Sequence, residues 1–149
     1  MRAVVQRVRD CTVSVEGRET GRIERGLLVY LGVGQDDAEA DLAYIAEKVG
    51  NLRIFPDSAG KMNLSAADQD LPILVVSQFT LYGDARNGRR PSYSSAAEPQ
   101  KARSLYLRLL QELRDRGFAV QEGEFAASME VRYSNVGPVT ILLDSRKLF

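Results

Sequence analysis

The chain contains no histidine and only one cysteine, Cys11, among its 149 residues. Mechanisms of the Ser-His-Asp and Cys-His kinds are therefore excluded within the chain, because each uses an imidazole as its base. A single cysteine cannot form an internal disulfide, and without histidine we expect no structural zinc site. We interpret Cys11 as a small core residue. Any chemistry must come from carboxylates, hydroxyls, backbone N–H groups or the substrate, and we expect no metal.

Long apolar runs are also missing. None approaches the roughly 20 residues that a membrane-spanning helix requires, and the start at Met1–Arg7 has no signal-peptide layout. We therefore expect a cytoplasmic protein without a membrane partner. The content of 44% apolar and 27% charged residues is ordinary for a soluble protein. A chain of about this length buries roughly 68–70% of its unfolded surface, so we expect residues 1–149 to form one domain.

An excess of basic charge is absent as well, because 20 basic residues balance 20 acidic ones. Proteins that bind nucleic acid normally show a basic footprint. A local patch stays open as an interpretation, since Arg86, Arg89 and Arg90 fall close together. From charge alone, a contact with phosphates and a plain solvated loop explain these arginines equally well.

The order of apolar patterns predicts strands alternating with two helices. Short apolar or alternating runs predict strands at 3–8, 11–15, 26–33, 51–55, 73–81, 129–134 and 139–143. Helical periodicity predicts one helix that Asp36 or Asp37 caps and Gly50 ends. The second helix is expected after a capping box at 95–98, with Pro99 in its first turn and its end at Gly117. This order predicts an α/β or α+β domain with helices against mixed sheets.

The glycine pattern that would indicate a nucleotide cofactor is incomplete. Gly32 and Gly34 follow a strand and precede a helix, as in a dinucleotide fingerprint, but Asp37 stands in place of the third glycine. An acidic residue at the start of a helix would repel a pyrophosphate. We therefore expect no cofactor.

Two segments stand out as candidate sites. Ser77–Thr80 ends the most apolar predicted strand, where successive N–H groups can form an oxyanion hole. The alternative is a strand that is no longer buried at its end, with Ser and Thr capping the backbone. Gly137–Pro138 interrupts the last pair of strands, and proline removes a ladder donor while glycine permits close approach. About 5–6% of X-Pro bonds in folded proteins are cis, so the residues alone favour a trans kink.

Four segments together resemble the D-aminoacyl-tRNA deacylase family in order and spacing, and the resemblance runs the whole length of the chain. They are Met1–Val8, Ser77–Asp84, Gly88–Ser92 and Asn135–Thr140. The resemblance implies a homodimer in the cytoplasm that hydrolyses the ester of D-aminoacyl-tRNA and also removes glycine wrongly attached to tRNA(Ala). For the fold it implies α/β structure, with mixed sheets in a barrel-like core and flanking helices in three layers.

The resemblance also implies roles for particular residues. Gly137–Pro138 would have a cis bond and reach into the partner's pocket, where its carbonyls hold the α-amino group and exclude an L side chain. Arg7 would help to orient this loop, and Met129 would line the pocket. Ser77 would bind the substrate near the ester and the terminal adenosine. The catalytic positions would be three residues: Gln78, Phe79 and Thr80.

The mechanism stays open between two versions. Thr80 is a nucleophile candidate, but no base is visible to activate its hydroxyl. We prefer the 2′-OH of the tRNA or an ordered water, with the N–H groups of Phe79 and Thr80 facing the oxyanion. Two positions depart from the family pattern, which has Asp at Val136 and Gly at Ala126. The rival functions are a binding module without catalysis and hydrolysis of another small ester or amide.

Overall fold

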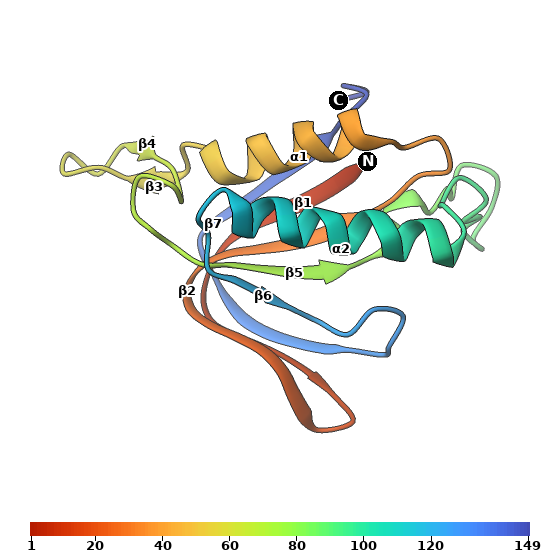
Figure 1. The fold of residues 1–149 in the computed structure, drawn as a ribbon, viewed down its shortest axis with the longest axis horizontal. Helices are drawn as coiled ribbons and strands as arrows, with labels where there is room; N and C mark the ends of the chain where they lie inside the picture. Colours follow the sequence, from red (N-terminus) through yellow and green to blue (C-terminus); the bar gives the residue numbers. More distant parts are fainter.

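The computed structural model describes residues 1–149 as one mixed sheet with two helices and a small hairpin (Figure 1). The elements are β1 (Arg2–Val15), β2 (Arg18–Gly32), α1 (Glu39–Asn51), β3 (Phe55–Pro56), β4 (Met62–Leu64), β5 (Ile73–Ser77), the 3₁₀ helix η1 (Phe79–Tyr82), α2 (Pro99–Asp115), β6 (Val120–Glu122) and β7 (Glu130–Asp144). The sheet order is β6-β5-β2-β1-β7. Pairs β1–β2 and β1–β7 are antiparallel, whereas β2–β5 and β5–β6 are parallel.

Both helices pack on one face of this sheet, as Figure 1 shows. Alternate residues of the central strands face the helices, because successive side chains of a strand point to opposite faces. In β2 these are Leu27, Val29 and Leu31, and in β5 they are Ile73 and Val75. The predicted α/β class with helices against a mixed sheet is confirmed.

The face of β2 and β5 that points away from the helices is covered by residues of β1. Leu28, Leu74 and Val76 pack there against Val8 and Cys11, from the part of β1 beyond its bend. The register of β1 against β7 shifts once on each side of Val8, between Gln6 and Val8 and between Arg9 and Thr12. Such irregularities are β-bulges, which bend a strand. The long strands therefore curl under the sheet and form a third layer.

The expected barrel-like core is only partly formed. The strands curl, but β6 and β7 remain the two edges of the sheet and are not hydrogen-bonded to each other. The sheet is therefore open and not a closed barrel. Neither α1 nor α2 has the length and hydrophobicity that a membrane-spanning helix needs.

The predicted ends of the first helix were wrong. α1 begins after Ala38, whose N–H donates to the Asp41 carboxylate at 2.8 Å, so neither Asp36 nor Asp37 caps it. Gly50 lies inside the helix, where a Cβ would stand 2.7 Å from the ring of Phe118. The glycine there allows close packing and does not terminate the helix.

Further boundaries also differ from the sequence patterns. The predicted capping box at 95–98 does not form, because Glu98 is the N-cap of α2 and makes no side-chain cap bond; Pro99 is in the first turn as predicted. The strand predicted at 51–55 is reduced to Phe55–Pro56, and the one at 73–81 ends at Ser77. The last two predicted strands are one continuous strand, β7.

Candidate functional site

A cavity of about 630 Å³ opens beside the end of β5, between the start of α2 and the segment that leads into β7. Most of its lining is apolar. Burial raises the pKa of Tyr106 in this lining, so its hydroxyl stays protonated and donates to the Val75 carbonyl at 3.0 Å. Several residues singled out from the sequence also line the cavity: Ser77, Gln78, Phe79 and Met129.

The end of β5 leaves backbone donors without partners. The Gln78 N–H still continues the sheet and donates to the Leu31 carbonyl at 2.7 Å, after which the chain turns into η1. The first N–H groups of a helix have no acceptor within it. Neither Phe79 nor Thr80 donates its N–H to a loop carbonyl or to a capping side chain. Two consecutive N–H groups therefore remain free to stabilise a developing oxyanion.

The hydroxyl of Thr80 has no base beside it. Thr80 is exposed and stands outside the cavity lining, and its Oγ1 accepts a hydrogen bond from the Gln78 side-chain amide. An amide donor cannot remove the hydroxyl proton, so this contact does not activate a nucleophile. The one carboxylate in the cavity lining belongs to Glu98, which the sequence indicated only as part of a helix cap.

Gly137–Pro138 lies on the exposed part of β7, and its peptide bond is cis, whereas the residues alone favoured trans. Neither residue lines the cavity of its own chain. Arg7 holds the base of this segment: its Nε donates to the Val136 carbonyl at 3.0 Å and its Nη1 to the Ile54 carbonyl at 2.6 Å. The structure thus places Arg7 against the loop that contains Gly137–Pro138, and this loop does not line the cavity of its own chain.

The side chain of Asn135 links the two ends of the segment that contains Gly137–Pro138, a contact that the sequence did not indicate. Its Oδ1 accepts from the Val139 N–H and its Nδ2 donates to the Thr140 hydroxyl, each at 3.1 Å. The Gln6 amide also donates to Thr140 Oγ1, at 2.9 Å. Position Val136, where the family pattern has aspartate, supplies its carbonyl to Arg7 and exposes its side chain.

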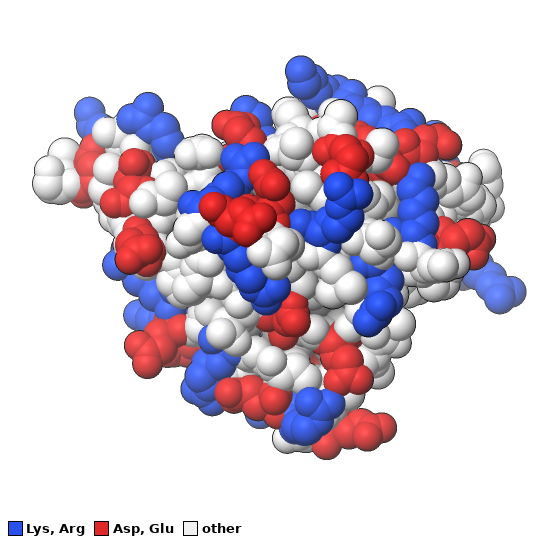
Figure 2. Space-filling view, in the orientation of Figure 1, with Lys and Arg blue, Asp and Glu red and all other residues white.

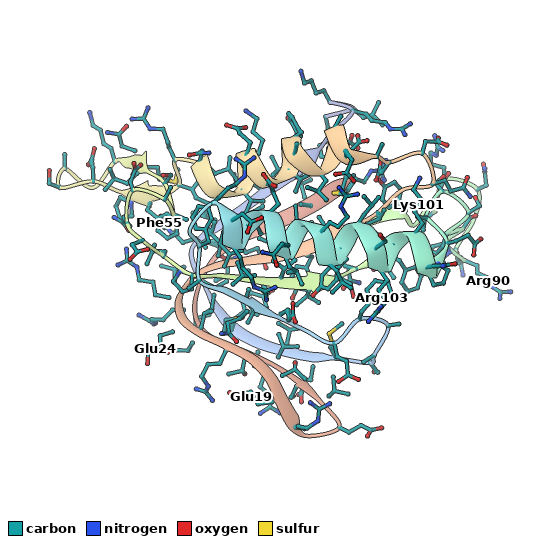
Figure 3. The ribbon with its side chains drawn as sticks, viewed as in Figure 1. Glu19, Glu24, Phe55, Arg90, Lys101 and Arg103 are labelled. Atoms are coloured by element: carbon teal, nitrogen blue, oxygen red, sulfur yellow. The ribbon has the colours of Figure 1, made fainter.

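The three candidate arginines differ in their surroundings. Arg86 forms a two-pronged contact with the Asp84 carboxylate, at 2.9 and 2.6 Å, and this arginine holds the pKa of Asp84 well below its usual range. Arg89 and Arg90 are exposed and make no ion pair within the chain. Figure 3 shows Arg90 projecting from its loop away from the body of the protein. Figure 2 shows charges of both signs interspersed on the face it presents.

A buried aspartate connects η1 to the chain start. Asp37 Oδ2 accepts from the Gly34 N–H at 2.6 Å and from the Tyr82 hydroxyl at 3.1 Å, while Oδ1 pairs with the Met1 ammonium at 2.7 Å. Burial and the charge of Asp37 raise the pKa of Tyr82, so this hydroxyl remains a donor. Asp37 therefore fixes the end of the 3₁₀ helix η1 through its contact with Tyr82.

Cys11 is fully buried, and this desolvation raises its pKa to about 11. A thiol with a raised pKa is a poor nucleophile at neutral pH, because the thiolate is the reactive form. Cys11 packs with Val8 and Leu28 in the layer under the sheet. Its interpretation as a core residue agrees with this position.

Comparison with known proteins identifies relatives over the whole chain. The family described as D-Tyr-tRNA(Tyr) deacylase matches residues 4–144. Proteins named D-aminoacyl-tRNA deacylase from Thermotoga petrophila and Syntrophobacter fumaroxidans are 57% and 56% identical to this chain, with 100% of each chain covered.

Solved structures share the fold. The one described as "c-Myc DNA Unwinding Element Binding Protein" superposes with a TM-score of 0.91 at 39% identity, covering 97% of this chain and 98% of the other. A probable eukaryotic D-amino acid tRNA deacylase superposes with a TM-score of 0.82 at 17% identity, covering 95% and 97% of the two chains. At that identity the second likeness supports the fold alone.

Proposed function

Since this chain belongs to the D-Tyr-tRNA(Tyr) deacylase family, we propose that it hydrolyses the ester bond of D-aminoacyl-tRNA, releasing the D-amino acid and free tRNA. The observation that carries the proposal is the pair of unengaged N–H groups at Phe79 and Thr80 beside a mainly apolar cavity. The cavity would take the terminal adenosine, with Ser77 near the ester. The two N–H groups would stabilise the charge that develops on the carbonyl oxygen.

The first test is direct release of the amino acid. D-Tyr-tRNA incubated with the purified protein should lose its D-tyrosine far faster than in buffer. A cavity-filling variant, Ala102→Phe, should abolish this rate because Ala102 lines the cavity. Equal rates with and without the wild-type protein would contradict the proposed function.

The chemistry is assigned to the substrate and the backbone. A water oxygen bonds to the carbonyl carbon, the bond to the ribose 3′-oxygen breaks, and that oxygen takes up a proton. Because only an amide donor contacts the Thr80 hydroxyl, we assign the proton transfer to the 2′-OH of the tRNA or a water that it orders. Gln78 would then hold the Thr80 side chain in place.

Two substitutions separate this mechanism from a threonine nucleophile. D-Tyr attached to tRNA ending in 2′-deoxyadenosine should react much more slowly, and an undiminished rate would exclude the 2′-OH version. Thr80→Ala should retain most of its activity if the hydroxyl is not the nucleophile. Near-complete loss with intact tRNA binding would instead assign the nucleophile to Thr80.

Chiral selection is assigned to Gly137–Pro138 of a second copy. The segment is exposed and stands outside the cavity of its own chain, and the exposed apolar side chains of Val136 and Leu142 lie on the same strand. We therefore propose a cytoplasmic homodimer in which each loop completes the partner's cavity. Its carbonyls would hold the α-amino group, and an L side chain would meet backbone. Glycine has no side chain to clash, so glycine on tRNA(Ala) would also be removed.

Mixing two variants tests this arrangement. Gly137→Ala should damage the loop but leave its own cavity open, whereas Ala102→Phe should fill the cavity but leave the loop intact. Excess Ala102→Phe mixed with Gly137→Ala should restore D over L selection, because each open cavity then gains an intact loop. An unchanged ratio in verified mixed dimers would place the filter within one chain.

The description of one solved relative as a DNA-binding protein supports a second candidate, nucleic-acid binding without catalysis. The balanced charge of 20 basic and 20 acidic residues does not favour broad duplex contact. Duplex DNA competing strongly with tRNA, together with no release of D-tyrosine, would support this alternative.

A further inference from the structure

Two aromatic rings are exposed at the cavity. Phe79 is 57% exposed and Tyr93 is 39% exposed, and both belong to the cavity lining. Their ring centroids lie 5.1 Å apart with the planes inclined at 70°, an edge-to-face contact. In such a pair the rings brace one another while at least one ring face stays uncovered. Large aromatic side chains are usually mostly buried, so an exposed, braced pair next to a cavity indicates a ligand.

The loop that carries Tyr93 is closed by contacts within the chain. Asp84 and Ser92 exchange two backbone hydrogen bonds of 2.8 Å, which close the loop, and the Arg86 side chain is locked onto Asp84. Gly83 leaves room at the base, since a Cβ there would lie 3.1 Å from the ring of Tyr93. The loop thus presents an aromatic ring at its base.

The far part of the same loop is cationic. Arg89 and Arg90 are exposed beyond the Asp84–Ser92 closure, and neither makes an ion pair within the chain. One segment therefore combines an aromatic face beside the cavity with two free guanidinium groups farther out. Proteins that hold single-stranded nucleic acid use this combination, with bases stacked on aromatic rings and phosphates beside basic groups.

We propose that Phe79 and Tyr93 form a stacking site for the unpaired base that precedes the terminal adenosine, with Arg89 and Arg90 contacting the backbone phosphates. The proposal rests on the proposed function, because the adjoining cavity is assigned to the terminal adenosine. Continuity with that cavity favours the penultimate nucleotide of a tRNA 3′ end. The ring faces accept any base, so the site would tighten binding without reading tRNA identity.

The ratio of kcat/KM between two minimal substrates tests the site. D-tyrosyl esters of adenosine and of the dinucleotide cytidylyl-adenosine share everything except the added cytidine. In the wild-type protein the dinucleotide should have roughly a tenfold higher kcat/KM, the order expected for one stacked base. Tyr93→Ala should remove most of this gain and Tyr93→Phe should retain it. The ratio cancels effects on the shared adenosine part.

Met62→Ala is the matched control, because Met62 is 59% exposed and lies on β4, at the opposite end of the molecule from the loop (Figure 1). This variant should keep the wild-type ratio. No gain from the cytidine in the wild-type protein, or an equal gain in Tyr93→Ala, would overturn the stacking site.

A binding measurement keeps the inference separate from catalysis. An RNA hairpin ending in a single-stranded tail, with 2-aminopurine before the terminal adenosine, should lose fluorescence on binding the wild-type protein. Tyr93→Ala should abolish this quenching. Quenching unchanged in that variant overturns the stacking site even if D-Tyr-tRNA is hydrolysed, whereas Tyr93-dependent quenching without hydrolysis supports the site and contradicts the proposed reaction.

Discussion

At the scale of single residues, Gly137 shows why this position admits no side chain. Its φ is +128°, a backbone conformation that L residues rarely adopt, and a Cβ would lie 2.8 Å from Val139 Cγ2 and 2.9 Å from Arg7 Nη2. The glycine is therefore required both by backbone conformation and by close approach of its neighbours.

Gly137→Ala should accordingly lower the free energy of unfolding by about 2–3 kcal/mol, the order for a strained residue that also displaces a contact. Gly60→Ala is the control, since Gly60 also has a positive φ, of +78°, but nothing within 4 Å of its Cβ position. It should lose about 1 kcal/mol at most. Urea unfolding measures both, and equal losses would show that crowding around Gly137 contributes nothing.

Cys11 gives a prediction about pH. Burial raises its pKa to about 11 from an ordinary value of about 8.5, so folding favours the protonated thiol. This stabilisation is complete below pH 8.5 and is lost as the pH rises toward 11. At pH 8 a disulfide reagent should label the native protein on the order of 100-fold more slowly than the urea-unfolded chain. Equal labelling rates would contradict the buried position.

At the scale of elements, sequence patterns located the two helices and the longer strands but not their ends, and they missed the short elements β4, η1 and β6. Apolar periodicity follows burial, so β2, β5 and the face of α1 were visible in it. The ends depend on contacts between distant residues. Gly50 lies inside α1 where Phe118 packs against it, and Asp37 bonds Gly34, Tyr82 and Met1 instead of capping α1. No local rule contains these partners.

The Asp37 contacts therefore stabilise the junction between η1 and the segment before α1. Asp37→Asn should lower the free energy of unfolding by about 3 kcal/mol, because breaking a buried ion pair leaves a charge without a partner. Asp36→Asn should change it by less than about 0.5 kcal/mol, since the Asp36 side chain is 81% exposed. Similar losses in the two variants by urea unfolding would refute the assigned role of Asp37.

At the scale of the whole molecule, the sequence predicted the α/β class, and the family resemblance implied a barrel-like core with flanking helices in three layers. It did not predict that the sheet stays open, because closure depends on whether β6 and β7 meet. The sequence also pointed to Ser77–Thr80 and Gly137–Pro138, and only the family resemblance assigned the second segment to a partner's pocket. The structure places Ser77, Gln78 and Phe79 in the cavity lining of their own chain, whereas Thr80 and Gly137–Pro138 lie outside it. It adds Tyr93, Glu98 and Asn135, whose roles arise from tertiary contacts.

The arrangement of charge predicts how tRNA binding responds to salt. Arg89→Gln and Arg90→Gln should each weaken binding and reduce the slope of log K against log salt by about 1, as expected for one lost phosphate contact. Arg86→Gln should leave the slope nearly unchanged, because Asp84 already neutralises this guanidinium. A filter-binding titration at several salt concentrations decides between them. Equal slopes in all three variants and the wild type would remove the loop from the tRNA interface.

The most direct test of the account compares three substrates in parallel: D-Tyr-tRNA, L-Tyr-tRNA and Gly-tRNA(Ala). Each is incubated with the wild-type protein under single-turnover conditions, and the rate of ester hydrolysis is measured. The account predicts rapid release of D-tyrosine and glycine and no acceleration for L-tyrosine. Equal hydrolysis of the D and L esters would contradict the assignment of Gly137–Pro138 as the chiral filter.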